Sequence, residues 1–181
     1  MKKNENLFLE PSFYEKFHSK AGRRGNETAI IIEESGIEVT YENLISDVKK
    51  IAYHLWSCGV RSNDVVAGQL PNGYEALLMF LASTAMGIKY APCAVDDPST
   101  IERLALCVPV KYLVLLEPYE YVGETVVAKI YLPQKLHELE IAAIPTSNSD
   151  QLAASLFLLT SGSTGDPKIM SINCSRLWDS A

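Results

Sequence analysis

Residues 64–116 read DVVAGQLPNGYEALLMFLASTAMGIKYAPCAVDDPSTIERLALCVPVKYLVLL, and this stretch decides the fold class. Short apolar runs that are typical of buried strands alternate in it with longer segments that are typical of helices. The pattern predicts strands over residues 64–70, 90–95 and 112–116, and helices over 75–86 and 98–107. Because strands that alternate with helices usually pair in parallel, we expect an α/β fold with a mostly parallel sheet flanked by helices.

The segment before this stretch predicts two helices and a hairpin. The expected elements are a helix over residues 8–20, a break over 22–26, strands over 28–32 and 37–40, and a helix that begins after Thr40. Thr40 is a typical N-cap, and Gly59 stands where a C-terminal cap is expected. Between them, apolar residues recur in steps of three and four on one helical face: Leu44, Val48, Ile51, Ala52, Leu55 and Trp56.

The chain length of 181 residues is enough for one domain and marginal for two. We expect a single domain over residues 1–181, with helices and a hairpin in 1–63 and the βαβ sheet in 64–181. After residue 116 the pattern weakens. Another strand is indicated over 126–131, and the rest of 117–150 is typical of a surface connection.

Residues 160–168 read TSGSTGDPK and carry the sharpest chemical signal. They follow an apolar strand predicted over 156–159, and such a strand–loop junction places phosphates at the carboxyl edge of a parallel sheet. Two glycines allow positive φ, so that backbone N–H groups can converge on an anion, while hydroxyls and a lysine add donors. The candidate phosphate-binding residues are Thr160, Ser161, Gly162, Ser163, Thr164, Gly165 and Lys168.

Two other interpretations of this loop fit the residues less well. A flexible Gly/Ser linker does not usually begin at a buried strand and end in Pro-Lys followed by apolar residues. The common P-loop requires Gly-Lys followed by Ser or Thr, whereas here Lys168 follows Pro167 and precedes Ile169. The loop is therefore predicted to be a phosphate-binding loop that is not a common P-loop.

The loop resembles the signature loop of the adenylate-forming superfamily, which includes acyl-CoA synthetases, adenylation domains of nonribosomal peptide synthetases, and luciferases. Upstream blocks agree with this resemblance in their order. They are Val39-Thr40-Tyr41-Glu42-Asn43-Leu44, Gly59-Val60, Asp64-Val65-Val66, Pro71-Asn72, the block from Met86-Gly87 to Pro92, and Glu102-Arg103. The resemblance covers residues 8–181.

The resemblance implies the fold of the N-terminal subdomain of these enzymes and a ligase reaction. ATP and a carboxylate would form an acyl-adenylate and pyrophosphate, with Mg²⁺ as cofactor, and the acyl group would pass to the thiol of CoA or of a carrier protein. In this resemblance the hydroxyls and Lys168 contact the β- and γ-phosphates of ATP, and Gly162 and Gly165 shape the loop.

The chain also departs from the superfamily pattern. The superfamily's adenine-stacking block, magnesium-binding Glu, ribose-binding Asp and C-terminal catalytic Lys have no counterpart here, so the catalytic residues are unknown and the magnesium ligand is expected outside this chain. Cys174 falls near a usual His position. We expect an incomplete adenylation domain that is inactive alone, truncated or completed by a second chain. The alternatives are a non-catalytic nucleotide- or phosphate-binding module and a remnant scaffold.

Composition narrows the class of protein. The hydrophobic fraction of 48% is ordinary for a globular protein, and the net charge of −6 disfavours nucleic acid as a partner. No signal peptide is apparent, and the apolar stretch over 76–88 is too short for a membrane span, so we expect a cytoplasmic protein. The four cysteines are expected to be reduced and mostly buried, and no metal site is predicted.

The remaining candidate residues have structural explanations that we favour over catalytic ones. His18, His54 and His137 are expected in structural or surface roles, and Asp96-Asp97 in a turn or helix cap rather than in a metal site. Cys174 lacks an identifiable base. Three tyrosines suit strand packing as well as base stacking: Tyr112, Tyr119 and Tyr121. The chain end at 176–181 has no helix stop signal, so we expect Trp178 to lack part of its packing and the natural chain to continue or a partner to cover it.

Overall fold

The computed structural model describes residues 11–33, 35–97, 99–118, 120–121, 123, 127–133, 135–161 and 167–178. Within these residues six strands form one sheet in the order β6-β5-β3-β4-β7-β8. They are β3 (Val65–Gln69), β4 (Lys89–Cys93), β5 (Tyr112–Leu116), β6 (Ala128–Leu132), β7 (Ser155–Ser161) and β8 (Pro167–Asn173). Neighbouring strands pair in parallel, except that β8 runs antiparallel to β7. The predicted α/β fold with a mostly parallel sheet is confirmed.

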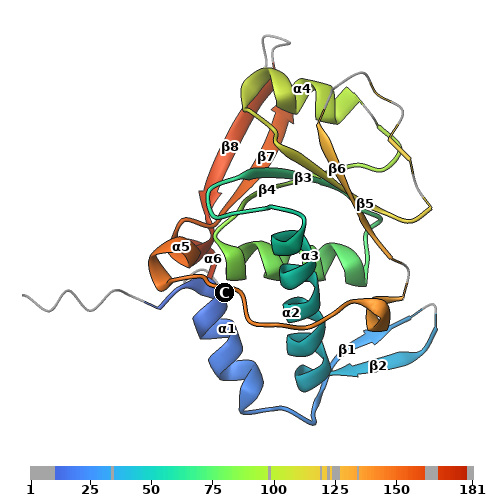
Figure 1. Cartoon of the computed structure of the whole chain (residues 1–181), viewed down its shortest axis with the longest axis vertical. Helices are drawn as coiled ribbons and strands as arrows, with labels where there is room; N and C mark the ends of the chain where they lie inside the picture. Colours follow the sequence, from blue (N-terminus) through green and yellow to red (C-terminus); the bar gives the residue numbers. More distant parts are fainter. Residues whose placement is uncertain are drawn as a thin grey trace, which may run out of the picture.

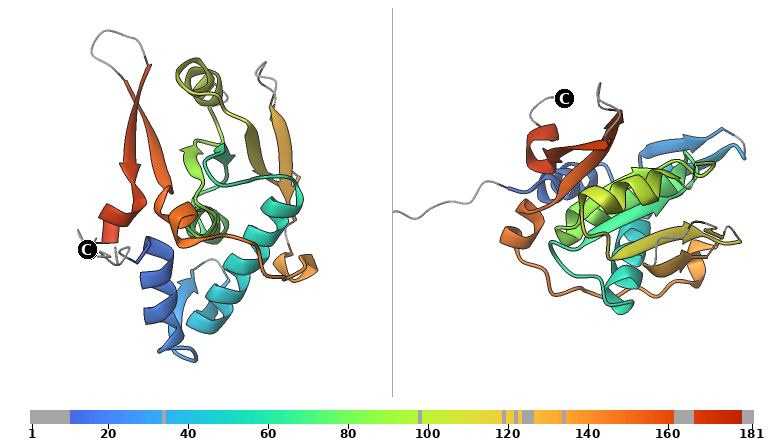
Figure 2. Two further views of the ribbon diagram at one scale, coloured as in Figure 1. Left: turned by 60° about the vertical axis from the view of Figure 1, so that its left-hand side comes forward. Right: turned by 90° about the horizontal axis from the view of Figure 1, so that it is seen from above.

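Helices cover both faces of this sheet (Figures 1 and 2). The first face carries α1 (Phe13–Gly22), α2 (Tyr41–Ser57) and α3 (Tyr74–Met86), and the second carries α4 (Ser99–Cys107). Successive strand residues alternate between the faces, so Val66 and Tyr90 pack in the first core while Ala67 and Ala91 pack in the second. Burial on both sides explains why the central strands β3 and β5 are inaccessible along almost their whole length.

The N-terminal hairpin and α2 follow the predicted pattern. β1 (Thr28–Ile32) pairs antiparallel with β2 (Ile37–Thr40), and the Thr40 hydroxyl accepts a hydrogen bond from the Asn43 N–H at 3.2 Å. At the other end Gly59 has φ of 95°, and the Val60 N–H donates to the Leu55 carbonyl at 3.0 Å. This pattern at Gly59 is a Schellman motif. The predictions that Thr40 caps the start of α2 and that Gly59 terminates it are therefore confirmed.

The first helix begins later than the pattern predicted. Residues 8–10 lie outside the described part, and α1 starts at Phe13. Its start is fixed by a capping box: the Ser12 hydroxyl accepts from the Glu15 N–H at 3.1 Å, and the Glu15 carboxylate accepts from the Ser12 N–H at 2.8 Å. Reciprocal bonds of this kind stop the helix from extending backwards.

The segment after β5 holds more structure than a surface connection. It contains β6, the short 3₁₀ turn η1 (Leu136–Glu138) and α5 (Asn148–Leu152), which begins in a capping box between Ser147 and Asp150. The prediction that residues 117–150 form only a strand and a connection was therefore wrong at α5. The helix α6 (Cys174–Trp178) and the strand β8 were not predicted either.

Trp178 is half-buried. It packs edge-on against Phe13, with ring centroids 5.5 Å apart, and the Lys20 ammonium lies 4.8 Å from its ring centroid. The expectation about the cysteines needs a correction. All four cysteines are free, as expected, but only Cys93 and Cys174 are buried. Cys58 and Cys107 are exposed because both lie at the ends of helices, beyond the apolar faces.

None of the helices in the described ranges is both long enough and apolar enough to cross a membrane. The most apolar of them, α3, is instead buried between α2, α1 and the sheet. Its interior hydroxyls are satisfied locally, because Ser83 donates to the Phe80 carbonyl at 2.6 Å and Thr84 to the Leu81 carbonyl at 2.7 Å.

Candidate functional site

The predicted phosphate-binding loop joins β7 to β8, which form a hairpin along one side of the sheet (Figure 2). Thr160 pairs directly with Lys168, and Ser161 pairs with Pro167. Four of the predicted site residues, Gly162, Ser163, Thr164 and Gly165, lie outside the described residues. The structure therefore places Thr160, Ser161 and Lys168 at the base of the loop.

Strand alternation decides where these side chains project. Phe157 and Ile169 pack in the core beneath α4, while Leu156 packs against the core of the opposite face. Because side chains of directly paired residues share a face, Thr160 and Lys168 project together from the face that carries α3. Both are exposed. The Thr160 hydroxyl donates to the Lys168 carbonyl at 3.3 Å, and Lys168 forms no ion pair with another described residue. Its ammonium is thus available to an anion.

The helix α4 braces the base of the hairpin from the other face. The Cys107 thiol, at the last residue of α4, lies 3.4 Å from the Pro167 carbonyl. The start of α4 is fixed by Asp97, whose carboxylate accepts from the Ser99 N–H at 3.1 Å and from the Thr100 hydroxyl at 2.9 Å. The side-chain hydrogen bonds from Ser99 and Thr100 lower the pKa of the Asp97 carboxyl. The predicted capping role within Asp96-Asp97 is confirmed.

A cleft of about 550 Å³ opens at the carboxyl ends of β3 and β4. The chain leaves β3 toward α3 on one face and leaves β4 toward α4 on the other, so the two loops diverge here. In α/β sheets such a switch point is the usual place for a ligand. Sequence reasoning missed this cleft, although Pro71-Asn72 and the loop after Cys93 mark the two strand ends.

The other candidate residues have structural roles. A His54 ring nitrogen lies 3.1 Å from the Tyr131 carbonyl, and the Tyr112 hydroxyl donates to the Gly59 carbonyl at 3.0 Å. Burial raises the pKa of the Cys174 thiol to about 11, which argues against an activated nucleophile. Burial, and then the charge of Lys49, lower the pKa of His18. Tyr119 lies outside the described residues.

The described residues contain no group of three or more His, Cys, Asp or Glu side chains that could hold a metal ion. We assign none of the described residues to Mg²⁺.

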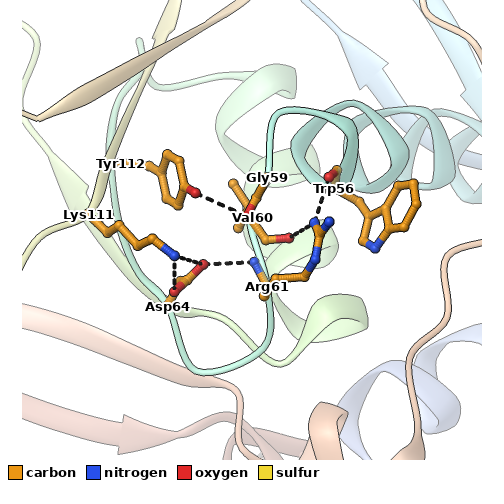
Figure 3. Close-up of polar contacts among 7 residues, drawn as sticks. All are labelled: Trp56, Gly59, Val60, Arg61, Asp64, Lys111 and Tyr112. Atoms are coloured by element: carbon orange, nitrogen blue, oxygen red, sulfur yellow. Dashed lines mark hydrogen bonds and ion pairs between the residues drawn. The ribbon is translucent and has the colours of Figure 1, made fainter.

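A polar cluster occupies the opposite edge of the sheet, where β3 and β5 begin (Figure 3). The Asp64 carboxylate accepts from the Arg61 N–H at 2.8 Å and from the Lys111 ammonium at 3.0 and 3.2 Å. The Arg61 guanidinium donates to the Trp56 carbonyl at 2.7 Å and lies 4.7 Å from the Trp56 ring centroid. These contacts hold the turn between α2 and β3, so the cluster is structural.

Replacing Asp64 with alanine is expected to lower the free energy of unfolding by about 1–2 kcal/mol, because the Arg61 N–H loses a charged acceptor. Lys111→Ala is the matched control, since its side chain is 53% exposed and an exposed ion pair contributes at most about 1 kcal/mol. Urea unfolding of both variants measures the difference. An Asp64→Ala loss no larger than that of Lys111→Ala would show that the hydrogen bond from the Arg61 N–H to Asp64 does not stabilise this turn.

Comparison with known proteins gives one family and several structural neighbours. Residues 17–175 match the family described as AMP-binding enzyme. The chain is 40% identical over 65 residues to acetoacetyl-CoA synthetase of Caenorhabditis elegans, a match that covers 36% of this chain and 9% of that protein.

Two solved structures share the fold. The N-terminal subdomain of Klebsiella oxytoca NpsA superposes with a TM-score of 0.75 at 20% identity and covers 90% of this chain and 42% of that one. O-succinylbenzoate coenzyme A synthetase (MenE) of Bacillus subtilis, solved in complex with AMP, gives a TM-score of 0.75 at 22% identity, with coverage of 94% and 44%. The chain thus spans less than half the length of these solved chains.

Proposed function

Since the chain belongs to the AMP-binding enzyme family, we propose that it is the N-terminal part of an AMP-forming carboxylate ligase whose β7–β8 hairpin binds the phosphates of ATP. The reaction would join a carboxylate to the AMP portion of ATP, release pyrophosphate, and then pass the acyl group to a thiol. CoA is the acceptor named in two of the relatives, and a carrier-protein phosphopantetheine is the second possibility.

The observation that carries the proposal is the pairing of Thr160 with Lys168 at the base of the loop. This register places a hydroxyl and an ammonium on the same face, where both can reach one anion. The antiparallel pairing fixes the relative positions of the two residues' backbones before a ligand arrives. Pro167 and its contact with Cys107 hold the second strand in place.

The chain's own residues would bind and orient phosphate oxygens. Lys168 would offset negative charge on the β- and γ-phosphates. The Thr160 hydroxyl would turn away from the Lys168 carbonyl, to which it now donates, and donate its hydrogen bond to a phosphate oxygen instead. Magnesium, when bound, would neutralise further phosphate charge. None of the described residues is assigned to the activation of the carboxylate.

A non-catalytic phosphate-binding module is the second candidate. It is favoured by the exposure of Thr160 and Lys168, because the described residues would contact a bound phosphate from one side only. A remnant scaffold would use the same fold with neither binding nor reaction.

Carboxylate-dependent exchange of pyrophosphate into ATP tests the proposal. The 181-residue chain alone is expected to show no exchange above background, because the described residues supply one wall of the site. The native protein, with any further polypeptide retained, is expected to exchange with at least one carboxylate. A native protein that binds pyrophosphate without exchange would be a binding module, and one that does neither would be a scaffold. Either outcome overturns the ligase proposal.

A further inference from the structure

A buried tyrosine whose hydroxyl has no protein partner lies at the cleft between β3 and β4. The Tyr90 side chain is 3% exposed and lines this cleft, yet its hydroxyl forms no hydrogen bond with any residue that the structure describes. The ring is buried, but the hydroxyl oxygen itself is not sealed off, so it opens onto the cleft and is accessible to a ligand. Burial raises the pKa of the Tyr90 phenol, so it stays protonated and can donate at neutral pH.

The neighbouring residues keep this hydroxyl at the cleft. A Cβ atom at Gly68 would lie 2.7 Å from the Tyr90 hydroxyl oxygen, so only glycine leaves room for the phenol in this position. Gln69 is 4% exposed and donates from its amide nitrogen to the carbonyls of Ala94 at 3.0 Å and Val95 at 3.2 Å. These bonds tie the loop after β4 to the end of β3, so the cleft is formed before a ligand binds.

The charge of the cleft selects the class of ligand. Asp96 is the one charged side chain among the described residues that line it, and no cation accompanies it. A phosphate or carboxylate would therefore be repelled, in contrast to the β7–β8 hairpin with its Lys168 ammonium. The volume of about 550 Å³ lies within the range of small-molecule sites.

We propose that this cleft is a second ligand site, distinct from the phosphate loop, that binds an uncharged small molecule through an amide group. The amide carbonyl accepts a hydrogen bond from the Tyr90 hydroxyl, and the amide N–H groups donate to the Asp96 carboxylate at the rim. Asn72 also lines the cleft, and its side-chain amide can donate to the ligand's carbonyl or accept from the ligand's N–H groups. The proposal does not depend on the ligase assignment, because it uses none of the hairpin residues.

The test compares nicotinamide with nicotinate, which have the same ring and differ in carrying an amide or a carboxylate. Amide-proton NMR titrations of the ¹⁵N-labelled chain report binding and its location together. Nicotinamide is expected to bind with a millimolar dissociation constant and to shift the signals of Gly68, Asn72 and Asp96, and nicotinate is expected to bind about tenfold more weakly.

Three variants locate the interaction. Tyr90→Phe keeps the ring in place and is expected to weaken nicotinamide binding by about tenfold. Asp96→Asn is expected to narrow the preference for nicotinamide over nicotinate. Lys168→Ala is expected to leave nicotinamide binding unchanged, which separates this site from the hairpin. Failure of nicotinamide to bind, equal binding of nicotinate, or unchanged binding by a folded Tyr90→Phe protein would each overturn the proposal.

Discussion

Replacing Gly87 with alanine is expected to lower the free energy of unfolding by about 2–5 kcal/mol. Gly87 ends α3 in the left-handed region, at φ of 72°, where an L side chain costs about 1–2 kcal/mol. A Cβ atom at this position would also lie 1.9 Å from the Asp150 carbonyl oxygen. That oxygen belongs to the backbone of α5, so the clash cannot be relieved by turning a side chain.

Two control variants separate the backbone cost from the clash. Gly36 has a similar φ of 68°, and a Cβ atom there would have no neighbour within 4 Å, so Gly36→Ala is expected to cost only about 1–2 kcal/mol. Gly22, the last residue of α1, has open space and no positive φ, and Gly22→Ala is expected to cost nothing. Urea unfolding followed by far-UV circular dichroism ranks the three. If Gly87→Ala loses no more stability than Gly36→Ala, α5 does not pack against the end of α3.

Replacing Lys168 with alanine is expected to weaken binding of pyrophosphate to the chain by about tenfold to a hundredfold. Lys168 is the cation that the hairpin register places beside Thr160, and hydrogen bonds to charged groups contribute about 1.5–3 kcal/mol. Lys168→Arg keeps the charge and is expected to retain most of the affinity. Titration calorimetry with pyrophosphate gives the dissociation constants.

The matched control for this variant is Lys135→Ala, which removes an exposed lysine in the connection after β6. It changes the net charge equally and is expected to leave the affinity within about twofold of the original, because exposed charges beyond a Debye length are screened. An equal loss of affinity in the two variants would mean that pyrophosphate responds to overall charge. In that case the hairpin would not be its site.

Local signals predicted the central part of the fold because the elements there are specified by nearby residues. The run at Tyr112–Leu116 is a strand with the predicted bounds. Thr40 fixes the start of α2 and Gly59 its end, each through hydrogen bonds to residues a few positions away. The strand β8 could not be found in this way. Its residues Pro167 to Asn173 alternate weakly, and the strand is held by pairing with β7 across the loop.

Two missed helices did carry readable signals. Ser147 and Asp150 have the spacing of a capping box, and Asn173 accepts a hydrogen bond from the Ser175 N–H at the start of α6. Both helices have five residues, too few to show an apolar period. The Tyr90 cleft was beyond sequence reasoning, because it depends on which strands become neighbours and on the room that Gly68 leaves for the Tyr90 phenol.

The central claim is that the loop between β7 and β8 binds the phosphates of ATP, and amide-proton NMR during a pyrophosphate titration tests it most directly. The account predicts that the largest chemical-shift changes fall within residues 160–168 and are lost in Lys168→Ala. Shift changes centred elsewhere in the chain, or saturable binding that leaves residues 160–168 unchanged, would contradict it.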